Sequence, residues 1–446
     1  MKKILLIIDT PVRDLYGIAL ISYELIKKYG HLPIITTTKN EIAALIKYKP
    51  DLIVMPHVRY ERNLSVLEFA KKQNTKVGIL PVEGYPPGEH WVKRTVIGLE
   101  AFYKYIDVLW VWGSYVKNIC EKNNTLPEKE INITGCPRFD LLSEKYDPIF
   151  RSKDAFCSDY QLNPKTPIVI WFSSSSYANP KGNFDEWVEN FYKSGAGKIV
   201  KGIFDVAVMG RVHQRAHDHI LELFIRLVKE YPECNFLVKP HPGEPKKPYH
   251  DALKDYANVR IINGNDQTIE LIRHSDIQLN WRCTTSVERW MNDIESRIIS
   301  IEPPNHELTD FNGYSSGNDV VKTFEELKER MIYYFEGGTV ASDLIENRKK
   351  FIRNYFRSND GNSTEKFCET IDTYLMRQGT PKRTIKNYMI IFSFLLRRIK
   401  RRGWIEMKRN HSHSKYFSPD DFHEFVEKLN KLFGTNISMK QYFLDV

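Results

Sequence analysis

The sequence predicts an α/β protein with two doubly wound parallel-sheet domains and a basic helical extension at the carboxyl end. Short apolar runs alternate with amphipathic segments along most of the chain, which is the pattern of parallel sheets covered by helices. A turn-rich, charged stretch at about 143–167 separates two such series. All excess positive charge lies after residue 376. We therefore expect domains at 1–145 and 165–375 and an extension at 377–446.

The first series begins with MKKILLIIDT, which imitates a secretory signal because two lysines precede an apolar run. That run ends at Asp9, too early for the apolar region of a signal peptide, so we expect a buried first strand. Helices are expected at 18–29 and 64–73. The expected strands are 4–9, 33–37, 51–56, 76–81, 107–112 and 131–135 in the first series, and 168–172, 203–208, 235–239, 259–262, 277–279 and 298–301 in the second.

Composition limits the classes of protein. With 446 residues and 42% hydrophobic residues, the chain can build two cores, and no run approaches the roughly 18 apolar residues of a membrane span. The six cysteines are scattered, without Cys-x-x-Cys pairs or histidines at zinc spacing. Glycine-rich nucleotide loops are absent, which argues against dehydrogenases and phosphoryl-transfer ATPases. We expect a reduced, cytoplasmic protein without a structural metal or a cofactor.

The extension carries a net charge of +9, with 15 Lys or Arg against 6 Asp or Glu, whereas the remaining residues contain 50 of each. Its centre, 387–404, sets a mostly apolar run before a basic cluster. This pattern is typical of a helix that lies on an anionic membrane surface, although a helix packed on the enzyme is the alternative. Nucleic-acid binding is not expected, because no aromatic residues are interleaved with the basic ones. We expect the protein at the inner face of the cell membrane.

Two polar motifs follow strands. ITGCPRFDLL at 133–142 places Arg138 and Asp140 at a strand's carboxyl end, where ligands bind in open α/β sheets, although Asp140 alone would also suit a helix cap. NFLVKPHPGE at 235–244 runs from an apolar strand into Lys, His and Glu between prolines, which by itself would also suit a rigid turn.

Together with VWGSYVK at 111–117, TTSVERW at 284–290 and SNDGNST at 358–364, these motifs resemble the bacterial surface carbohydrate biosynthesis proteins. That group consists of GT-B-fold glycosyltransferases, with capsule Kdo transferases and teichoic-acid polymerases as more distant relatives. The resemblance covers about residues 1–375, and Cys136 inside the first motif departs from it. It implies two domains facing across a cleft, a nucleotide-sugar donor and a glycan or glycolipid acceptor.

The donor side must stabilise negative charge that grows on a departing phosphate, which a metal-independent enzyme meets with cations and hydrogen-bond donors. His241 is the leading candidate for this role. Ser/Thr residues at a helix start would attract phosphate through backbone N–H groups, and Glu288 resembles the glutamate that binds ribose, although 285–288 also fits a capping box. The other candidate donor-binding residues are Ser173, Ser174, Ser175, Arg211, Lys239, Pro242, Glu244, Arg282, Thr284, Thr285 and Ser286.

The acceptor side must supply a base. Glu83 follows an expected strand before a rigid turn and is the leading candidate, with Asp9 and Glu89 as rivals. Arg138 and Asp140 are expected near the hinge, where an ion pair would hold the domains in register.

The sequence thus predicts a metal-independent glycosyltransferase of surface polysaccharide or lipopolysaccharide biosynthesis. A CMP-activated ulosonic acid, such as Kdo or a nonulosonate, is the leading donor, and UDP- and GDP-sugars stay open. One alternative is a teichoic-acid-type polyol-phosphate transferase, for which His57 and His90 are available as bases. Another is a UDP-sugar 2-epimerase. A non-catalytic assembly protein is the least favoured reading.

Overall fold

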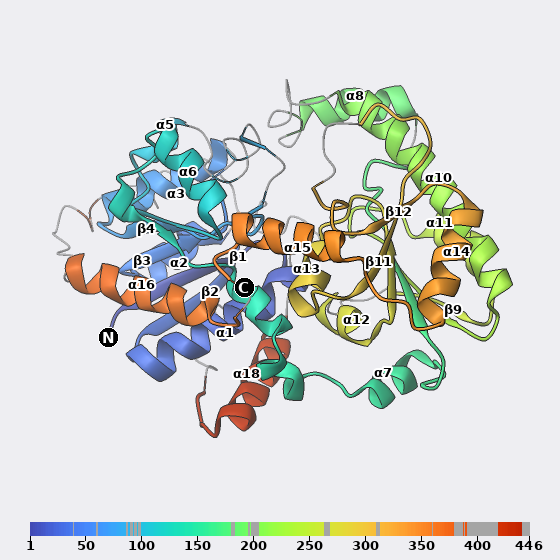
Figure 1. Ribbon diagram of the computed structural model, residues 1–446. Helices are drawn as coiled ribbons and strands as arrows, with labels where there is room; N and C mark the ends of the chain where they lie inside the picture. Colours follow the sequence, from blue (N-terminus) through green and yellow to red (C-terminus); the bar gives the residue numbers. More distant parts are fainter. Residues whose placement is uncertain are drawn as a thin grey trace. The chain divides into compact units, whose positions relative to one another are not determined.

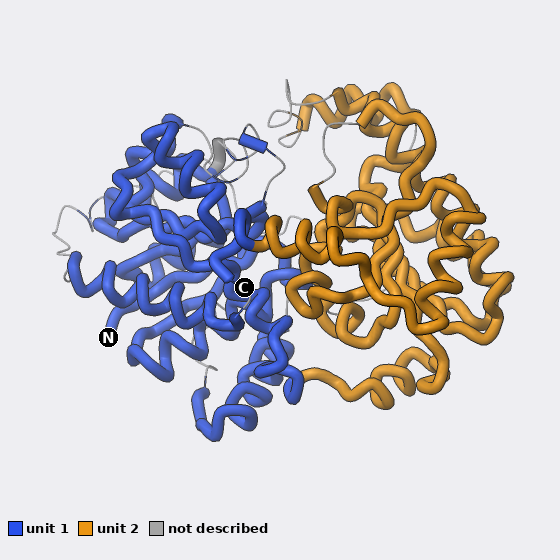
Figure 2. The backbone as a smooth tube through the Cα atoms, in the orientation of Figure 1, with its two compact units in different colours: residues 1–149, 353–446 blue, residues 150–352 orange. Residues whose placement is uncertain are grey.

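The computed structural model describes residues 1–38, 40–58, 61–85, 88–89, 92, 96, 100–179, 183–194, 197, 205–262, 268–308, 313–358, 360–378, 387, 389 and 418–438. The chain forms two compact units (Figure 2). Unit 1 contains Met1–Ile149 and Arg353–Val446, and unit 2 contains Phe150–Ile352. Each unit is built on one six-stranded sheet in which all neighbouring strands are parallel (Figure 1).

The sheet of unit 1 has the strand order β2-β1-β3-β4-β5-β6. Alternate side chains of its strands point to opposite faces, so both faces are covered. Leu5 of β1 lies in a core with α2, α3 and α6, while Trp110 of β5 packs edge-on against Phe367 of α16 on the other face. The elements are β1 (Lys3–Ile8), α1 (Pro11–Tyr29), β2 (Leu32–Thr37), α2 (Glu41–Tyr48), β3 (Leu52–Met55), α3 (Glu61–Lys72), β4 (Lys76–Ile79), α5 (Glu100–Tyr103), β5 (Val108–Val111), α6 (Ser114–Lys122), η2 (Glu128–Glu130), β6 (Ile131–Ile133), η3 (Pro137–Leu142), η4 (Glu144–Ile149), α16 (Ser363–Gln378) and α18 (Pro419–Phe433).

The sheet of unit 2 has the strand order β12-β11-β10-β7-β8-β9. Trp171 of β7 packs on Phe224 of α10, whereas Phe172, its neighbour, lies in a separate core with α7 and α12. The elements are α7 (Lys153–Tyr160), β7 (Ile168–Phe172), α8 (Phe184–Lys193), α10 (Val206–Glu230), β8 (Asn235–Lys239), α11 (Lys247–Leu253), β9 (Val259–Ile261), α12 (Thr268–His274), β10 (Ile277–Asn280), α13 (Thr285–Asn292), β11 (Arg297–Ile301), β12 (Asp319–Val321), α14 (Phe324–Phe335) and α15 (Ser342–Tyr355), whose last turn belongs to unit 1.

One predicted strand is wrong. The run expected at 203–208 enters helix α10 at Val206, while 203–204 lie outside the described residues. Asp205 begins this helix, because its Oδ1 accepts the backbone N–H groups of Ala207 at 2.7 Å and Val208 at 3.3 Å. An aspartate at this position satisfies N–H groups that a helix start leaves unpaired. The short strand β12 was not predicted.

The predicted second domain ends later in the sequence than unit 2 does. Residues 353–375 were assigned to the second domain, but they belong to unit 1, where α16 packs on α1. The extension also contributes to unit 1, since Phe425 of α18 stacks on Tyr16 of α1 with 4.1 Å between ring centroids. Removing everything after about residue 380 would therefore expose an apolar face of α1.

The expected membrane-surface helix at 387–404 lies outside the described residues, apart from residues 387 and 389. Across the part of the chain that is described, no helix combines the length and the apolar character that a membrane crossing requires.

Candidate functional site

Both sheets have a topological switch point, where successive strands are added on opposite sides of the first strand. In unit 1 this point lies between β1 and β3, and in unit 2 it lies between β7 and β10. Ligands of open α/β sheets bind beside the carboxyl ends of the strands at such points. Polar side chains gather there in both units.

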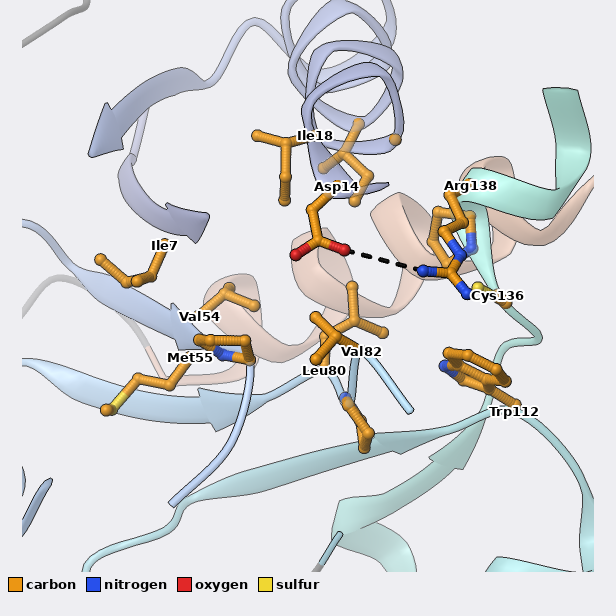
Figure 3. A pocket seen from close by; sticks show the side chains of 15 residues that line it. Ile7, Asp14, Ile18, Val54, Met55, Leu80, Val82, Trp112, Cys136 and Arg138 are labelled. Atoms are coloured by element: carbon orange, nitrogen blue, oxygen red, sulfur yellow. Dashed lines mark ion pairs between the residues drawn. The ribbon is translucent and has the colours of Figure 1, made fainter. Parts of the chain in front are cut away.

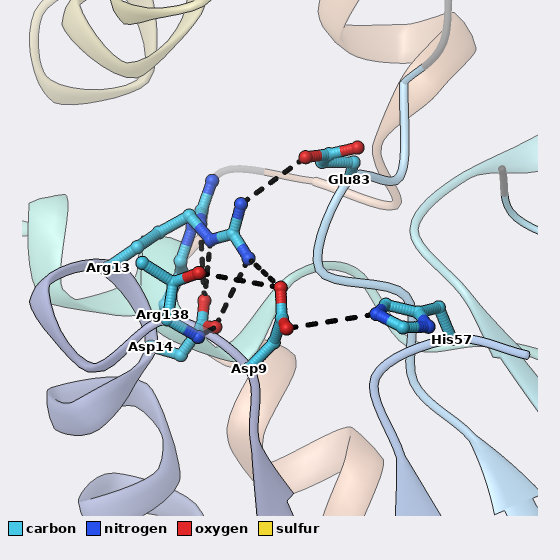
Figure 4. Close-up of polar contacts among 7 residues, drawn as sticks. Asp9, Arg13, Asp14, His57, Glu83 and Arg138 are labelled. Carbon is cyan, nitrogen blue, oxygen red and sulfur yellow. Dashed lines mark hydrogen bonds and ion pairs between the residues drawn. The ribbon is translucent and has the colours of Figure 1, made fainter. Parts of the chain in front are cut away.

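In unit 1 the switch point holds a network of charged groups centred on Arg13 (Figure 4). Asp9 directly follows β1, and its Oδ2 lies 3.3 Å from Arg13 Nη2. His57 follows β3, and its Nε2 lies 3.7 Å from Asp9 Oδ1. Glu83, after β4, places Oε1 3.4 Å from Arg13 Nη1. Arg13 thus connects the segments after β1 and β4, and Asp9 extends the network to the segment after β3.

Arg13 is held most firmly by Asp14. The Nε of Arg13 donates to Asp14 Oδ1 at 2.7 Å, and Asp14 Oδ2 accepts the backbone N–H of Thr10 at 2.9 Å, which fixes the start of α1. Burial alone would lower the pKa of Arg13, but the carboxylates of Asp14, Glu83 and Asp9 raise it above its ordinary value. The guanidinium therefore stays charged. Sequence reasoning missed Arg13, although its place in the first turn of the helix after β1 is a usable signal.

A cavity of about 50 Å³ lies beside this network (Figure 3). Apolar side chains such as Ile18, Val54 and Leu80 form most of its wall, and Asp14 and Arg138 contribute the charged groups. Because Asp14 belongs to both the cavity and the network, an apolar group of a ligand in this cavity would lie close to the carboxylates.

The predicted bases differ in their surroundings. Glu83 is 54% exposed and Asp9 17%, and both contact Arg13. The Oε2 of Glu89 instead lies 3.1 Å from Nζ of Lys122, the last residue of α6. His57 is only 3% exposed. His90 lies outside the described residues.

Arg138 and Asp140 both make their contacts inside unit 1. Arg138 Nη1 lies 3.7 Å from Asp14 Oδ1. Asp140 accepts the backbone N–H groups of Ser363 at 2.9 Å and Thr364 at 2.6 Å, so it caps helix α16 across more than two hundred residues of sequence. These contacts form a joint within unit 1, and the predicted ion pair between the domains stays a prediction. Two motifs of the family resemblance, 133–142 and 358–364, meet at this joint.

In unit 2 the segments after β7 and β8 are joined by buried hydrogen bonds. Ser173 Oγ donates to Glu244 Oε2 at 2.7 Å, and the one hydroxyl proton of Tyr249 is within reach of both Ser173 Oγ, at 2.7 Å, and the same Glu244 oxygen. Burial raises the pKa of Glu244, although these hydrogen bonds oppose the rise. Ser173 and Glu244 therefore tie the Pro-His-Pro turn to the sheet, and their contact with a donor stays a prediction.

The turn holds His241 exposed and in a defined orientation. Its Nδ1 accepts the backbone N–H of Gly243 at 3.1 Å, so Nε2 carries the proton of the neutral ring and can donate it to a ligand. Pro242 is exposed beside it, and Lys239 ends β8 half-buried. Ser174 donates to the carbonyl of Trp281, which joins this region to the segment after β10, and Ser175 is buried.

After β10, Arg282 adopts the left-handed conformation with φ 47°. Its Nε donates to Glu302 Oε1 at 3.1 Å, and the indole N–H of the preceding Trp281 donates to Glu302 Oε2. Glu302 is the first residue after β11. Sequence reasoning missed it, although a glutamate before two prolines at a strand's carboxyl end repeats the pattern that singled out His241.

Helix α13 begins at this edge, as predicted, but its hydroxyl groups differ in direction. Thr284 is the exposed N-cap residue. Thr285 Oγ1 accepts from Gln278 at 3.1 Å. Ser286 is fully buried and accepts from Asn280 at 2.9 Å, so its hydroxyl has a structural partner in this structure, and its phosphate contact stays a prediction. Glu288 lies half-buried in the first turn.

Arg211 and His213 lie on α10, so Arg211 does not follow the strand that was predicted at 203–208. Arg211 is exposed. His213 is buried between the rings of Tyr177 and Trp281, each with a centroid 5.0 Å away. Burial is the main cause that lowers the pKa of His213 to about 3, and the neighbouring side chains of His241 and Arg282 add to this shift. His213 is therefore neutral at physiological pH.

The described residues contain no group of three or more His, Cys, Asp or Glu side chains placed to hold a metal ion. The edge of unit 2 offers the imidazole of His241, the guanidinium of Arg282 and the start of α13, all of which attract phosphate. The edge of unit 1 offers carboxylates, which accept protons.

No protein-family model and no curated protein matches the sequence. Among solved structures, the chain is similar to UDP-GlcNAc 2-epimerase from Neisseria meningitidis bound to UDP-GlcNAc, with 14% identity, a TM-score of 0.53, and coverage of 83% of this chain and 100% of that one. MnaA of S. aureus with UDP gives 13% identity, a TM-score of 0.55, and coverage of 86% and 100%. The wall teichoic acid polymerase TagF gives 13% identity, a TM-score of 0.54, and coverage of 84% of this chain and 90% of that one.

At these identities the similarity concerns the fold. Two parallel six-stranded sheets with helices on their faces, shared along most of the chain with these proteins, confirm the predicted GT-B architecture.

Proposed function

We propose that the protein is a GT-B glycosyltransferase that moves a sugar from a nucleotide donor to a glycan acceptor. The observation that carries this proposal is the set of phosphate-attracting groups at one edge of the unit 2 sheet, where His241 follows β8 and where Arg282 and the start of α13 follow β10, on the two sides of β7. The bound ligands named for two proteins of similar fold, UDP-GlcNAc and UDP, support a nucleotide ligand.

In the proposed reaction, the bond between the anomeric carbon and the phosphate oxygen breaks, and its electron pair leaves with the phosphate. His241 and Arg282 stabilise that charge. A hydroxyl oxygen of the acceptor forms the new bond to the anomeric carbon, and its proton passes to Glu83. We favour Glu83 over Asp9 because it is the more exposed of the two carboxylates held by Arg13. Asp9 then keeps Arg13 and His57 in place.

We further propose that the product is a surface polysaccharide or lipopolysaccharide and that the basic cluster within 387–404 brings the enzyme to the inner membrane face, where lipid-linked acceptors lie. The family resemblance favours a CMP-activated ulosonic acid as donor. The structural neighbours with UDP ligands make UDP-sugars the main rival.

A thermal-shift screen with CMP, CDP, UDP and GDP tests the nucleotide. A ligand present at 100 times its dissociation constant adds about 2.7 kcal/mol to the stability of the state that binds it. One nucleotide should therefore raise the unfolding temperature clearly above the others. No shift with any of the four would contradict the proposal.

A UDP-sugar 2-epimerase is the second candidate, because one structural neighbour is a UDP-GlcNAc 2-epimerase bound to UDP-GlcNAc. Both reactions need stabilisation of the departing nucleotide, but only the transferase needs an acceptor. Incubation of the enzyme with UDP-GlcNAc alone separates them. An epimerase would convert the sugar without an acceptor, whereas a transferase would leave its C2 configuration unchanged.

A further inference from the structure

Glu302 connects two consecutive residues of the segment after β10. Its Oε1 accepts from Arg282 Nε at 3.1 Å, and its Oε2 accepts from the indole N–H of Trp281. The side chains of Glu302 and Arg282 are only 12% and 13% exposed, so solvent screens this pair far less than a surface pair. His306 also approaches, with Nε2 3.6 Å from Oε2.

The backbone at this segment needs such support. Arg282 has φ 47°, in the left-handed region that is unfavourable for a residue with a Cβ atom. Such conformations persist where the surroundings over-determine them, and they cluster at functional sites. A single carboxylate that holds the residues on both sides of one peptide bond provides that constraint.

The hydrogen bond through Nε also fixes the direction of the arginine. A guanidinium carries its five N–H donors in one plane, so fixing Nε sets the plane and the direction of both Nη groups. The position is at the switch point of unit 2, beside the segment after β7 to which Ser174 links it.

We infer that Glu302 is a positioning residue that aims Arg282 at the phosphate of the nucleotide donor. This inference rests on the proposed function. Glu302 also carries a negative charge close to the phosphate, so it limits ground-state attraction for the free nucleotide while it orders the cation that acts during bond cleavage. Geometry, and not added attraction, is its contribution.

The inference predicts that turnover falls while the affinity for the nucleotide does not. In Glu302→Gln one of the two acceptor oxygens becomes an NH₂ group, which faces an N–H donor and cannot bond to it. Turnover should fall about 10-fold or more, because misplaced catalytic groups lose rate steeply. The affinity for UDP and CMP, measured by calorimetry, should stay equal or become tighter, because a negative charge has been removed.

The matched control is Glu325→Gln, which breaks the exposed pair of Glu325 with Arg226 in the same unit. It should change neither quantity. A second variant, Arg282→Lys, keeps the charge but loses the planar donors, and it should reproduce the loss of turnover even if Glu302→Gln fails to fold. In an Arg282→Ala background, Glu302→Gln should have little further effect on turnover, because the residue it orients is gone.

Turnover is followed as nucleotide released from CMP-Kdo and from UDP-GlcNAc in the presence of acceptor glycan. Wild-type turnover in Glu302→Gln or in Arg282→Lys would overturn the inference while leaving the proposed function intact. The inference would also be overturned if Glu302→Gln reduced turnover by the same factor in the wild type and in the Arg282→Ala background. A wild-type enzyme inactive on both donors would instead overturn the proposed function, and the inference with it.

Discussion

The two sheet edges have the same architecture and opposite chemistry. Each lies at the switch point of a six-stranded parallel sheet, beside the end of that sheet's first strand. In unit 1, three carboxylates surround Arg13. In unit 2, His241 and Arg282 stand beside hydroxyl-rich turns, and Glu302 is committed to holding Arg282.

In the proposed function, this difference assigns the two halves of the reaction to the two edges. The parallel strands bring loops from distant parts of the sequence to one edge, and only the residues in those loops decide what the edge does. Carboxylates suit an acceptor that must lose a proton, and cations suit a phosphate that gains charge. Each prediction below tests one side of this division.

The largest effect is expected on the carboxylate side. Glu83→Gln should lower turnover by about 10² or more, because general bases contribute roughly 10²–10⁴. Nucleotide affinity should not change, because Glu83 belongs to the acceptor side. Steady-state kinetics and calorimetry measure the two effects. Glu89→Gln, which weakens the contact of Glu89 with Lys122 at the end of α6, is the control. A larger loss in Glu89→Gln than in Glu83→Gln would reverse the assignment.

The next effect is expected on the phosphate side. His241→Ala should lower turnover by about 10²–10³, the usual consequence of removing a donor aimed at developing charge. The fold should stay intact, because His241 is exposed and Glu244, not His241, ties the turn to the sheet. His250→Ala, an exposed histidine on α11, is the control. Full activity in His241→Ala would remove this residue from the site.

A smaller effect concerns stability and pH. The pKa of His213 falls from 6.5 to about 3 on folding, so below pH 6.5 the unfolded state binds a proton that the folded state does not. The stabilisation is therefore complete above pH 6.5 and is lost as the pH falls, by about 2 kcal/mol at pH 5 from this group. In His213→Phe, the unfolding temperature should drop less between pH 7 and pH 5 than in the wild type. An equal drop in both proteins would show that His213 is not held neutral.

No effect is expected from removing divalent metal. The proposed site meets the charge of the departing phosphate with His241, Arg282 and the start of α13, so EDTA should leave turnover unchanged. Activity that disappears with EDTA and returns with magnesium or manganese would show that these groups are insufficient.

The sequence was sufficient for the fold because buried parallel strands appear as short apolar runs with polar ends. It failed at 203–208, where an apolar run after Asp205 suits a strand or a helix equally, and long-range packing decided for the helix. The sequence predicted which polar residues lie at the carboxyl edges of the strands, but not the directions in which their side chains point. Ser286 and Glu244 are buried because Asn280, at the end of β10, and Tyr249, on α11, bond to them. Arg13, Glu302 and the cap formed by Asp140 likewise depend on partners that sequence spacing does not reveal.

Hydrogen–deuterium exchange with and without saturating nucleotide tests the central claim, that the edge of unit 2 binds the nucleotide. The nucleotide chosen by the thermal-shift screen should slow exchange in peptides covering 173–176, 240–244 and 282–288, and should leave peptides covering Asp9 and His57 unchanged. Protection confined to the edge of unit 1, or protection spread evenly over both units, would contradict the division of roles.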